Sequence, residues 1–250
     1  MRLFKLKPDK STAVIFVLGI LIILLSASMI LFSNTSLATF MNIVIRDFLM
    51  IYVLGFCFPL LHIQKNEADK YRVLGITKNK LAVSLTLNIV FAAILLSIFI
   101  WKTPAAITFN YKSMYAISYI LVAGIFEMIC IYGFIRHYLE RAFGIIPAIL
   151  LTAVIYSLHH AGFQPEFQKL FFVGVMYCSV FYITRNIFIV FPFFWGVGAV
   201  WDVLINSTAG RSLQSTTTLF VAIGLLIAMS LFVVVKGYLY ERERKIKKQL

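Results

Sequence analysis

One acidic residue lies deep in an apolar stretch of the sequence, where a charge is costly. Glu127 stands within residues 123–134 and has no lysine or arginine within one helical turn. Apolar surroundings disfavour the ionised form of a carboxyl group, and a carboxyl that changes protonation state near neutral pH can act as a general acid and base. Ala123 and Gly124 share its helical face, so a hydrogen bond across a close helix contact is the alternative role for Glu127.

Two neighbouring histidines form the second candidate group. His160 follows Tyr156 by four residues and therefore shares its helical face, whereas His159 is rotated by about 100 degrees. We therefore expect His160 to face the inside of a helix bundle and His159 to lie at the membrane interface.

A late apolar segment carries the third group. Gly198, Asp202 and Asn206 are spaced by four residues and form one polar stripe. Asp202 and Asn206 are candidates for orienting an imidazole or binding water, and a helix-packing hydrogen bond is the alternative. Arg46 and Asp47 are also adjacent within an apolar segment, and we interpret them as an interfacial ion pair.

The composition is that of a membrane protein. Of the 250 residues, 61% are apolar and 13% are charged, whereas an ordinary soluble domain is about half apolar and a quarter charged. One water-facing core cannot bury this much apolar surface. The composition therefore excludes a soluble enzyme, a disordered chain and a fibre, and predicts an all-α polytopic membrane protein.

Eight apolar segments approach the roughly 20 residues that a helix needs to cross the hydrocarbon core. They cover residues 11–32, 40–63, 81–101, 114–135, 145–160, 170–184, 187–206 and 217–238. The fifth and sixth are short enough to be tilted, broken or re-entrant. No repeat or linker divides the chain, so we expect residues 1–250 to form one integral membrane domain, a bundle of about eight spans.

The basic residues are distributed unevenly between the two sides of this topology. Of the 23 lysines and arginines, 18 fall in the two terminal segments and the loops on their side, 4 fall on the other side, and Arg46 lies in a span. By the positive-inside rule both termini are cytoplasmic. Anionic lipid explains the net charge of +13 better than nucleic acid does.

The three candidate groups are expected at a similar depth. At the rise of an α-helix, Glu127 lies about 24 Å from the inner boundary if its helix continues through residues 136–141, His160 about 24 Å and Asp202 about 22 Å. We therefore expect the three groups to meet in the outer half of the bilayer.

These residues resemble the motifs of the CAAX protease and bacteriocin-processing family of intramembrane endopeptidases. The first motif of that family is EExxxRG. Glu127 matches its first glutamate and Gly133 its glycine, whereas Met128 replaces the second glutamate and Tyr132 replaces the arginine.

The second and third family motifs, FxxxH and HxxxN, follow in the same order. Tyr156 and His160 match FxxxH with one aromatic residue exchanged for another. Asp202 and Asn206 match HxxxN if aspartate stands in for histidine; otherwise Asp202 takes the asparagine position and Gly198 the histidine position. The resemblance covers about residues 114–206, the expected protease core.

The resemblance implies peptide-bond hydrolysis by a Glu-activated water. Glu127 would be the general base, and His160 would donate to the developing oxyanion or help hold the water. The supporting candidates are His159, Tyr132, Asp202 and Asn206. Without an HExxH motif the ligands would have to come from three helices, so we expect no metal and no cofactor.

The family resemblance also implies a partner and a location. The expected substrate is a membrane-associated peptide or protein, and the expected location is a bacterial plasma membrane. Two other functions use the same polar residues: a catalytically silent immunity or scaffold protein, in which they join helices, and a small proton-coupled transporter. A transporter would be expected to have repeated halves, and the sequence has none.

Overall fold

The computed structural model describes residues 2–67, 69–102, 111–162, 166–190, 194–201 and 216–247, and these residues contain helices but no strand. The helices, with 3-10 and π segments marked η, are α1 (Lys10–Ser28), η1 (Met29–Phe32), α2 (Ala38–Met41), η2 (Asn42–Cys57), α3 (Phe58–Asn66), α4 (Lys70–Leu74), α5 (Leu81–Lys102), α6 (Tyr111–Phe126), η3 (Glu127–Ile135), α7 (Arg136–Phe143), α8 (Ile145–Leu158), α9 (Phe167–Thr184), η4 (Ile187–Val190), α10 (Phe194–Trp201) and α12 (Thr216–Lys247). The predicted all-α fold is confirmed.

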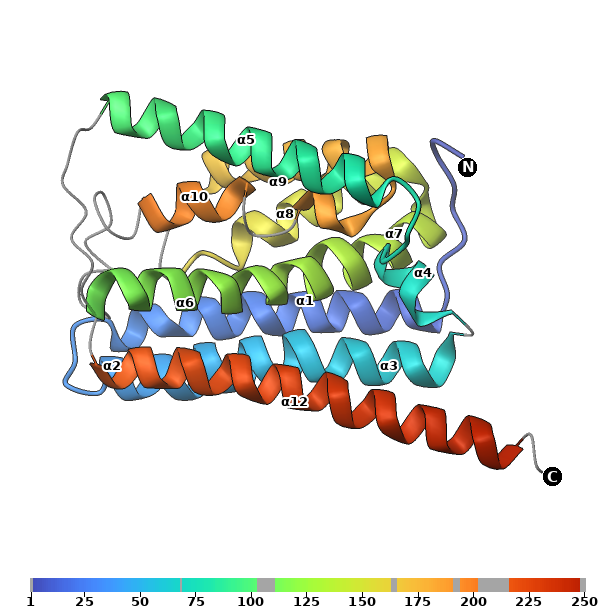
Figure 1. Ribbon diagram of the computed structural model, residues 1–250, viewed down its shortest axis with the longest axis horizontal. Coiled ribbons are helices and arrows are strands. Elements are labelled where there is room, and N and C mark those ends of the chain that lie inside the picture. Colours follow the sequence, from blue (N-terminus) through green and yellow to red (C-terminus); the bar gives the residue numbers. More distant parts are fainter. Residues whose placement is uncertain are drawn as a thin grey trace.

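Within the described ranges, six helical stretches are long and apolar enough to cross a membrane, and they lie side by side in a bundle (Figure 1). They are Lys10–Phe32, Ala38–Asn66, Leu81–Lys102, Ser113–Phe143, Phe167–Thr184 and Thr216–Lys236. The fifth and seventh predicted segments are not among these six stretches. The helix in the fifth ends after 14 residues, and the described part of the seventh consists of η4 and the eight-residue α10.

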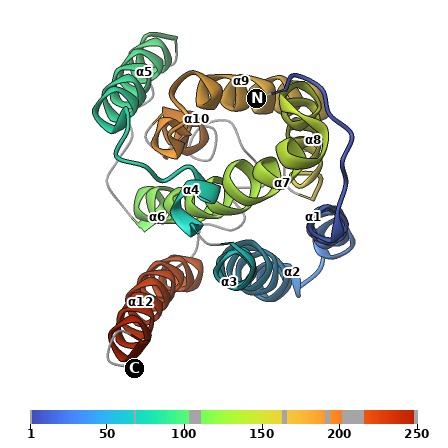
Figure 2. The same ribbon diagram turned by 90° about the vertical axis from the view of Figure 1, so that its right-hand side faces the viewer.

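The fourth spanning helix forms the centre of the bundle. Seen from the end, α6 and α7 lie between α9 and α10 on one side and α3 and α12 on the other (Figure 2). Within its most apolar 18-residue stretch, 61% is buried inside the protein, compared with 39% or less for the corresponding stretches of the other five spans. A helix that is apolar on all sides is suited to this position, and it carries Glu127 into the interior.

The N-terminal segment and the C-terminal end of α12 lie at the same end of the bundle (Figure 1). The N-terminal segment is attached there by backbone hydrogen bonds. The amides of Lys5 and Lys7 donate to the carbonyls of Phe143 and Ala142, each at 2.8 Å. Gly144, with φ of 90°, separates α7 from α8 at this point, and a side chain there would collide with the N-terminal backbone.

The Arg46–Asp47 pair lies inside the bundle, so its predicted interfacial position is wrong. Arg46 is 2% exposed and Asp47 is 3% exposed. The Arg46 Nε donates to Asp47 Oδ1 at 2.6 Å, and the guanidinium lies 4.4 Å from the ring centroid of Tyr119. Neighbouring charges of opposite sign and an aromatic face make the burial of Arg46 tolerable.

We predict that Asp47→Asn destabilises the fold. The substitution leaves the buried Arg46 without its counter-charge, which should lower the free energy of unfolding by about 3–5 kcal/mol. Thermal unfolding of the purified protein in detergent, followed by circular dichroism, should give a lower midpoint. The double variant Arg46→Met/Asp47→Leu removes both charges and should unfold near the wild-type midpoint; an unchanged midpoint for Asp47→Asn would contradict the assignment.

Candidate active site

Glu127 and both histidines meet in the interior of the bundle. Glu127 is 4% exposed, and its Oε1 lies 3.4 Å from His159 Nε2 and 3.6 Å from His160 Nε2. The two imidazole ring centroids are 3.9 Å apart. The predicted convergence of Glu127 with His160 is therefore present, whereas His159, at 2% exposure, lies in the interior and not at the interface as expected.

The end of α8 explains why consecutive histidines reach one carboxylate. The helix stops at Leu158, and the amides of the two histidines bond back to Ile155 and Ser157 as the chain turns. From this end of α8, both imidazoles lie against Glu127, the first residue of η3.

A contact with α1 holds the turn that carries the histidines. The amide of Gly162 donates to the Ser26 hydroxyl at 3.1 Å. A Cβ atom at residue 162 would lie 1.9 Å from the carbonyl oxygen of Ser26. Only glycine therefore allows this close approach, and Gly162 positions His160 from two residues away.

The ring of His160 has a defined orientation. Its Nδ1 lies 2.8 Å from the Tyr156 carbonyl oxygen, which can only accept a hydrogen bond, so Nδ1 is the protonated nitrogen. In the neutral ring Nε2 is then an acceptor directed toward the Glu127 carboxyl.

Tyr132 reaches the same region because the central helix widens. Glu127 is the first residue of the π segment η3, in which backbone amides bond to the carbonyl five residues earlier. Residues five apart therefore share a face, and Glu127 and Tyr132 are such a pair. The Tyr132 ring packs against those of Tyr156 and Tyr177, with centroids 5.6 and 5.8 Å away.

Three polar atoms around this cluster have no hydrogen-bond partner among the described residues. They are Glu127 Oε2, Tyr132 Oη and His159 Nδ1, and all three are buried. Buried polar atoms are nearly always paired with protein or ordered water. The carboxyl oxygen, the hydroxyl and the ring nitrogen therefore offer hydrogen-bonding capacity to water or a substrate.

Glu127, His159 and His160 also fit a metal ion by donor type and spacing. One ligand atom from each lies within 4.8 Å of the others. The Glu–His separations of 3.4 and 3.6 Å are close to the ~3.3 Å between neighbouring ligands of a tetrahedral zinc ion with bonds of about 2.0–2.1 Å. The expectation of a metal-free site stays a prediction.

The remaining predicted residues, Asp202 and Asn206, lie outside the described part of the chain. Gly198 is described on α10, where a Cβ atom at this position would contact the side chains of Leu95 and Phe99 of α5, at 3.5 and 3.9 Å. Tyr177, which was not among the predicted site residues, faces Tyr132 from α9. The sequence feature that could have indicated Tyr177 is a hydroxyl group in the middle of an apolar span.

Residues 109–200 match the family model described as Rce1-like, type II CAAX prenyl endopeptidase. The predicted resemblance to the CAAX protease family is confirmed. The matched segment contains Glu127, Tyr132 and both histidines, and it ends just before Asp202. No curated protein and no solved structure matches the chain. The CAAX protease match supports an integral membrane protein that is an intramembrane endopeptidase.

We predict that Gly162→Ala lowers the thermal unfolding midpoint. The added methyl group forces the turn away from the Ser26 carbonyl, and neither atom is the flexible end of a side chain. The matched variant Ser26→Ala loses only the hydrogen bond to the Gly162 amide, worth about 0.5–1.5 kcal/mol. Unfolding scans in detergent should place Gly162→Ala below Ser26→Ala. The reverse order would contradict the role of the close backbone approach.

Proposed function

We propose that this protein is a glutamic-type intramembrane endopeptidase. The observation that carries the proposal is a buried carboxyl within 3.6 Å of two imidazoles, inside the segment that matches CAAX proteases. Peptide hydrolysis requires a base for water and a later source of a proton for the leaving amine. A carboxyl that interacts with histidines in an apolar interior is suited to both tasks.

Glu127 and His160 hold the attacking water in this mechanism. The water donates one hydrogen to the ionised Glu127 carboxylate and the other to His160 Nε2, whose acceptor role follows from the bond at Nδ1. The water oxygen attacks the peptide carbonyl carbon as its proton passes to Glu127. The same proton then moves from Glu127 to the leaving nitrogen as the tetrahedral intermediate collapses and the C–N bond breaks, which restores the carboxylate.

Tyr132 supplies the donor for the oxyanion. Its hydroxyl is buried and has no partner among the described residues, so it is available to the negative oxygen of the tetrahedral intermediate. It stands at the position of the family's arginine. His159, Asp202 and Asn206 are proposed to support the water and the imidazole.

The surrounding aromatic rings limit the access of bulk water. Tyr156 contacts both imidazoles, with centroids 5.5 and 5.0 Å away, and Phe126 packs edge-on against His159 at 5.6 Å. In low-dielectric surroundings each hydrogen bond to a developing charge is stronger. By limiting the entry of bulk water, these aromatic rings favour the reaction of one bound water molecule over its exchange with solvent.

The proposed substrate is a peptide or protein at the membrane, because the cluster lies within the apolar bundle. We further propose that residues 1–250 form one integral domain with residues 114–206 as the protease core, in a bacterial plasma membrane with cytoplasmic termini. The competing function is that of a silent immunity or scaffold protein, in which Glu127 only joins helices.

We predict that Glu127→Gln abolishes peptide cleavage. The amide cannot accept the water proton, so the rate should fall by about 10²–10⁴-fold. The measurement uses proteoliposomes and a panel of fluorogenic peptides with lipid anchors. Glu166→Gln is the matched control, since Glu166 is exposed and pairs with Lys169 at 2.8 Å, and it should cleave like the wild type.

Two outcomes of that experiment would contradict the proposal. Unchanged cleavage by a folded Glu127→Gln variant would remove Glu127 from the mechanism. Failure of the wild-type protein to cleave any peptide of the panel would favour the silent scaffold. Thermal unfolding of each variant separates a loss of chemistry from a loss of fold.

A metal-dependent endopeptidase is the second candidate, supported by the spacing of Glu127, His159 and His160. A bound metal ion would polarise the peptide carbonyl or activate water. For the glutamic mechanism we predict that cleavage survives dialysis against EDTA and 1,10-phenanthroline. Loss of activity that zinc restores, together with about one metal ion per wild-type chain and none in His159→Ala, would assign the metal mechanism instead.

A further inference from the structure

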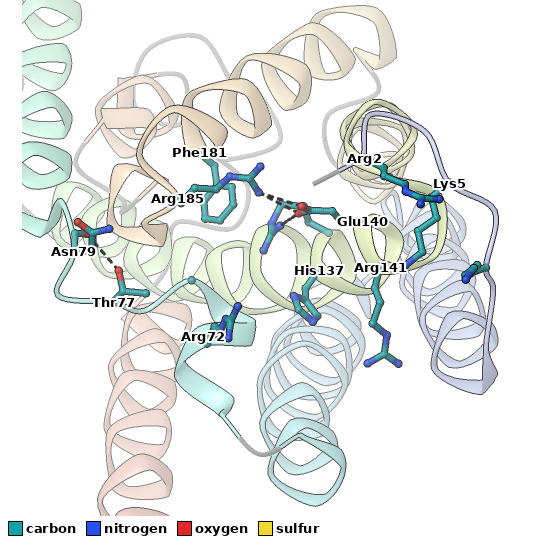
Figure 3. Close-up of a pocket in the computed structure, with 14 residues that line it drawn as sticks. Arg2, Lys5, Arg72, Thr77, Asn79, His137, Glu140, Arg141, Phe181 and Arg185 are labelled. Carbon is teal, nitrogen blue, oxygen red and sulfur yellow. Dashed lines mark hydrogen bonds and ion pairs between the residues drawn. The ribbon is translucent and has the colours of Figure 1, made fainter.

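A basic cavity of about 730 Å³ opens at the end of the bundle where the N-terminal segment lies. Figure 3 shows Arg2 and Lys5 on one side of this cavity and Arg72 of α4 on the other. Its lining includes seven lysines and arginines but one acidic residue, Glu140. Such a surplus of positive charge around one hollow attracts anions.

The arginines at the base of the cavity already have acidic partners. Arg136 Nη1 lies 2.8 Å from Glu140 Oε2, and Arg185 Nη1 lies 3.1 Å from Glu140 Oε1. Arg141 pairs with Asp9 and Glu67, which lie outside the lining. These arginines form a rigid floor, and Arg136 is further held over the Phe181 ring at 4.1 Å.

The rim carries charge that the protein does not neutralise. Arg2, Lys5, Lys7 and Arg72 all line the cavity and make no ion pair with any described residue. Three come from the N-terminal segment and one from α4, so the cations face the hollow from two directions. An anion in the cavity would therefore meet several unpaired cations together.

The backbone keeps the N-terminal cations in place. Besides the bonds from Lys5 and Lys7, the amides of Ile145 and Ile146 donate to the carbonyls of Arg2 and Leu3, at 3.3 and 3.1 Å. The first residues thus run along the α7–α8 junction as an attached strand-like segment. A wall fixed in this way forms a cavity of defined shape, which a freely moving basic tail does not.

We propose that this cavity binds the phosphate group of an anionic phospholipid. The central helix ends at Phe143 and α9 ends at Thr184, while α1 begins at Lys10 and α5 at Leu81, so the cavity lies level with the ends of four spans. Lipid headgroups occupy this level of a bilayer. Basic pockets between spanning helices are suited to anionic headgroups.

The cavity is separate from the proposed active site. Arg136 is nine residues beyond Glu127 on the central helix, about two turns of the π segment η3 away. Lipid binding here therefore does not depend on the proposed proteolysis and can be measured in protein that cleaves nothing.

The test compares two double variants with equal loss of charge. Lys5→Gln/Arg72→Gln removes cations from the rim, whereas Lys65→Gln/Lys78→Gln removes exposed cations that do not line the cavity. Phosphatidylglycerol, phosphatidylcholine and inorganic phosphate are titrated separately into each protein in detergent. Thermal midpoints measure stabilisation by the ligand, and native mass spectrometry counts retained lipids.

We expect phosphatidylglycerol to stabilise the wild type and phosphatidylcholine not to do so. The rim variant should need about thirtyfold more phosphatidylglycerol, since each cation near the headgroups contributes about fivefold. The control variant should behave like the wild type. No stabilisation of the wild type, or an equal loss in both variants, would overturn the proposal. If inorganic phosphate stabilises the wild type as much as phosphatidylglycerol does and no lipid is retained, the proposal of a lipid ligand is overturned and the cavity is a site for soluble phosphate.

Discussion

The constraint on which this structure depends is that a polar group inside an apolar bundle must find another polar group. An unpaired charge in the interior costs several kcal/mol, and lipid offers no hydrogen bonds in exchange. Glu127 therefore lies beside two imidazoles, Arg46 beside Asp47, and Arg136 beside Glu140. Among the described residues, the group around Glu127 has an unpaired polar atom on three side chains, whereas the Arg46–Asp47 pair has one, at Arg46 Nη2. This larger number of unpaired atoms is why we propose a reactive role for the group around Glu127 and a structural role for the other.

Composition and helical spacing predict Glu127 and His160 as candidate site residues, and the structure brings the two side chains within 3.6 Å of each other. An isolated carboxyl in an apolar run is conspicuous, and a Tyr-xxx-His pattern places the imidazole on a definite face. His159 was assigned to the membrane interface because helical spacing rotates it by about 100 degrees from His160, whereas both imidazoles contact Glu127 at the end of α8. The turn that follows α8 is held by the contact between Gly162 and Ser26, 136 residues apart in the sequence. The spacing of residues within one helix does not reveal a contact between segments so far apart in the sequence.

Other features that the sequence does not predict also arise from the packing of the helices. The π geometry of η3 brings Tyr132 onto the face of Glu127, whereas α-helical spacing would separate residues five apart by about 140 degrees. The interior position of Arg46 depends on Tyr119, which belongs to another helix and supplies an aromatic face. Apolar length alone predicted eight spans, but α8 has 14 residues, fewer than a full crossing needs, and α10 is described over eight residues.

The central helix carries both the proposed active site and the floor of the basic cavity, but different side chains serve them. The Nε of Arg136 donates to the carbonyl of Tyr132, so the backbone of the turn that presents the Tyr132 hydroxyl is fixed from the basic end. Arg136 is already paired with Glu140 and stacked on Phe181, and it has little capacity left for a ligand. Anion binding therefore falls to the rim cations on the N-terminal segment and α4. Because those residues do not touch Glu127 or the histidines, charge at the rim can change without moving the groups that would handle the water.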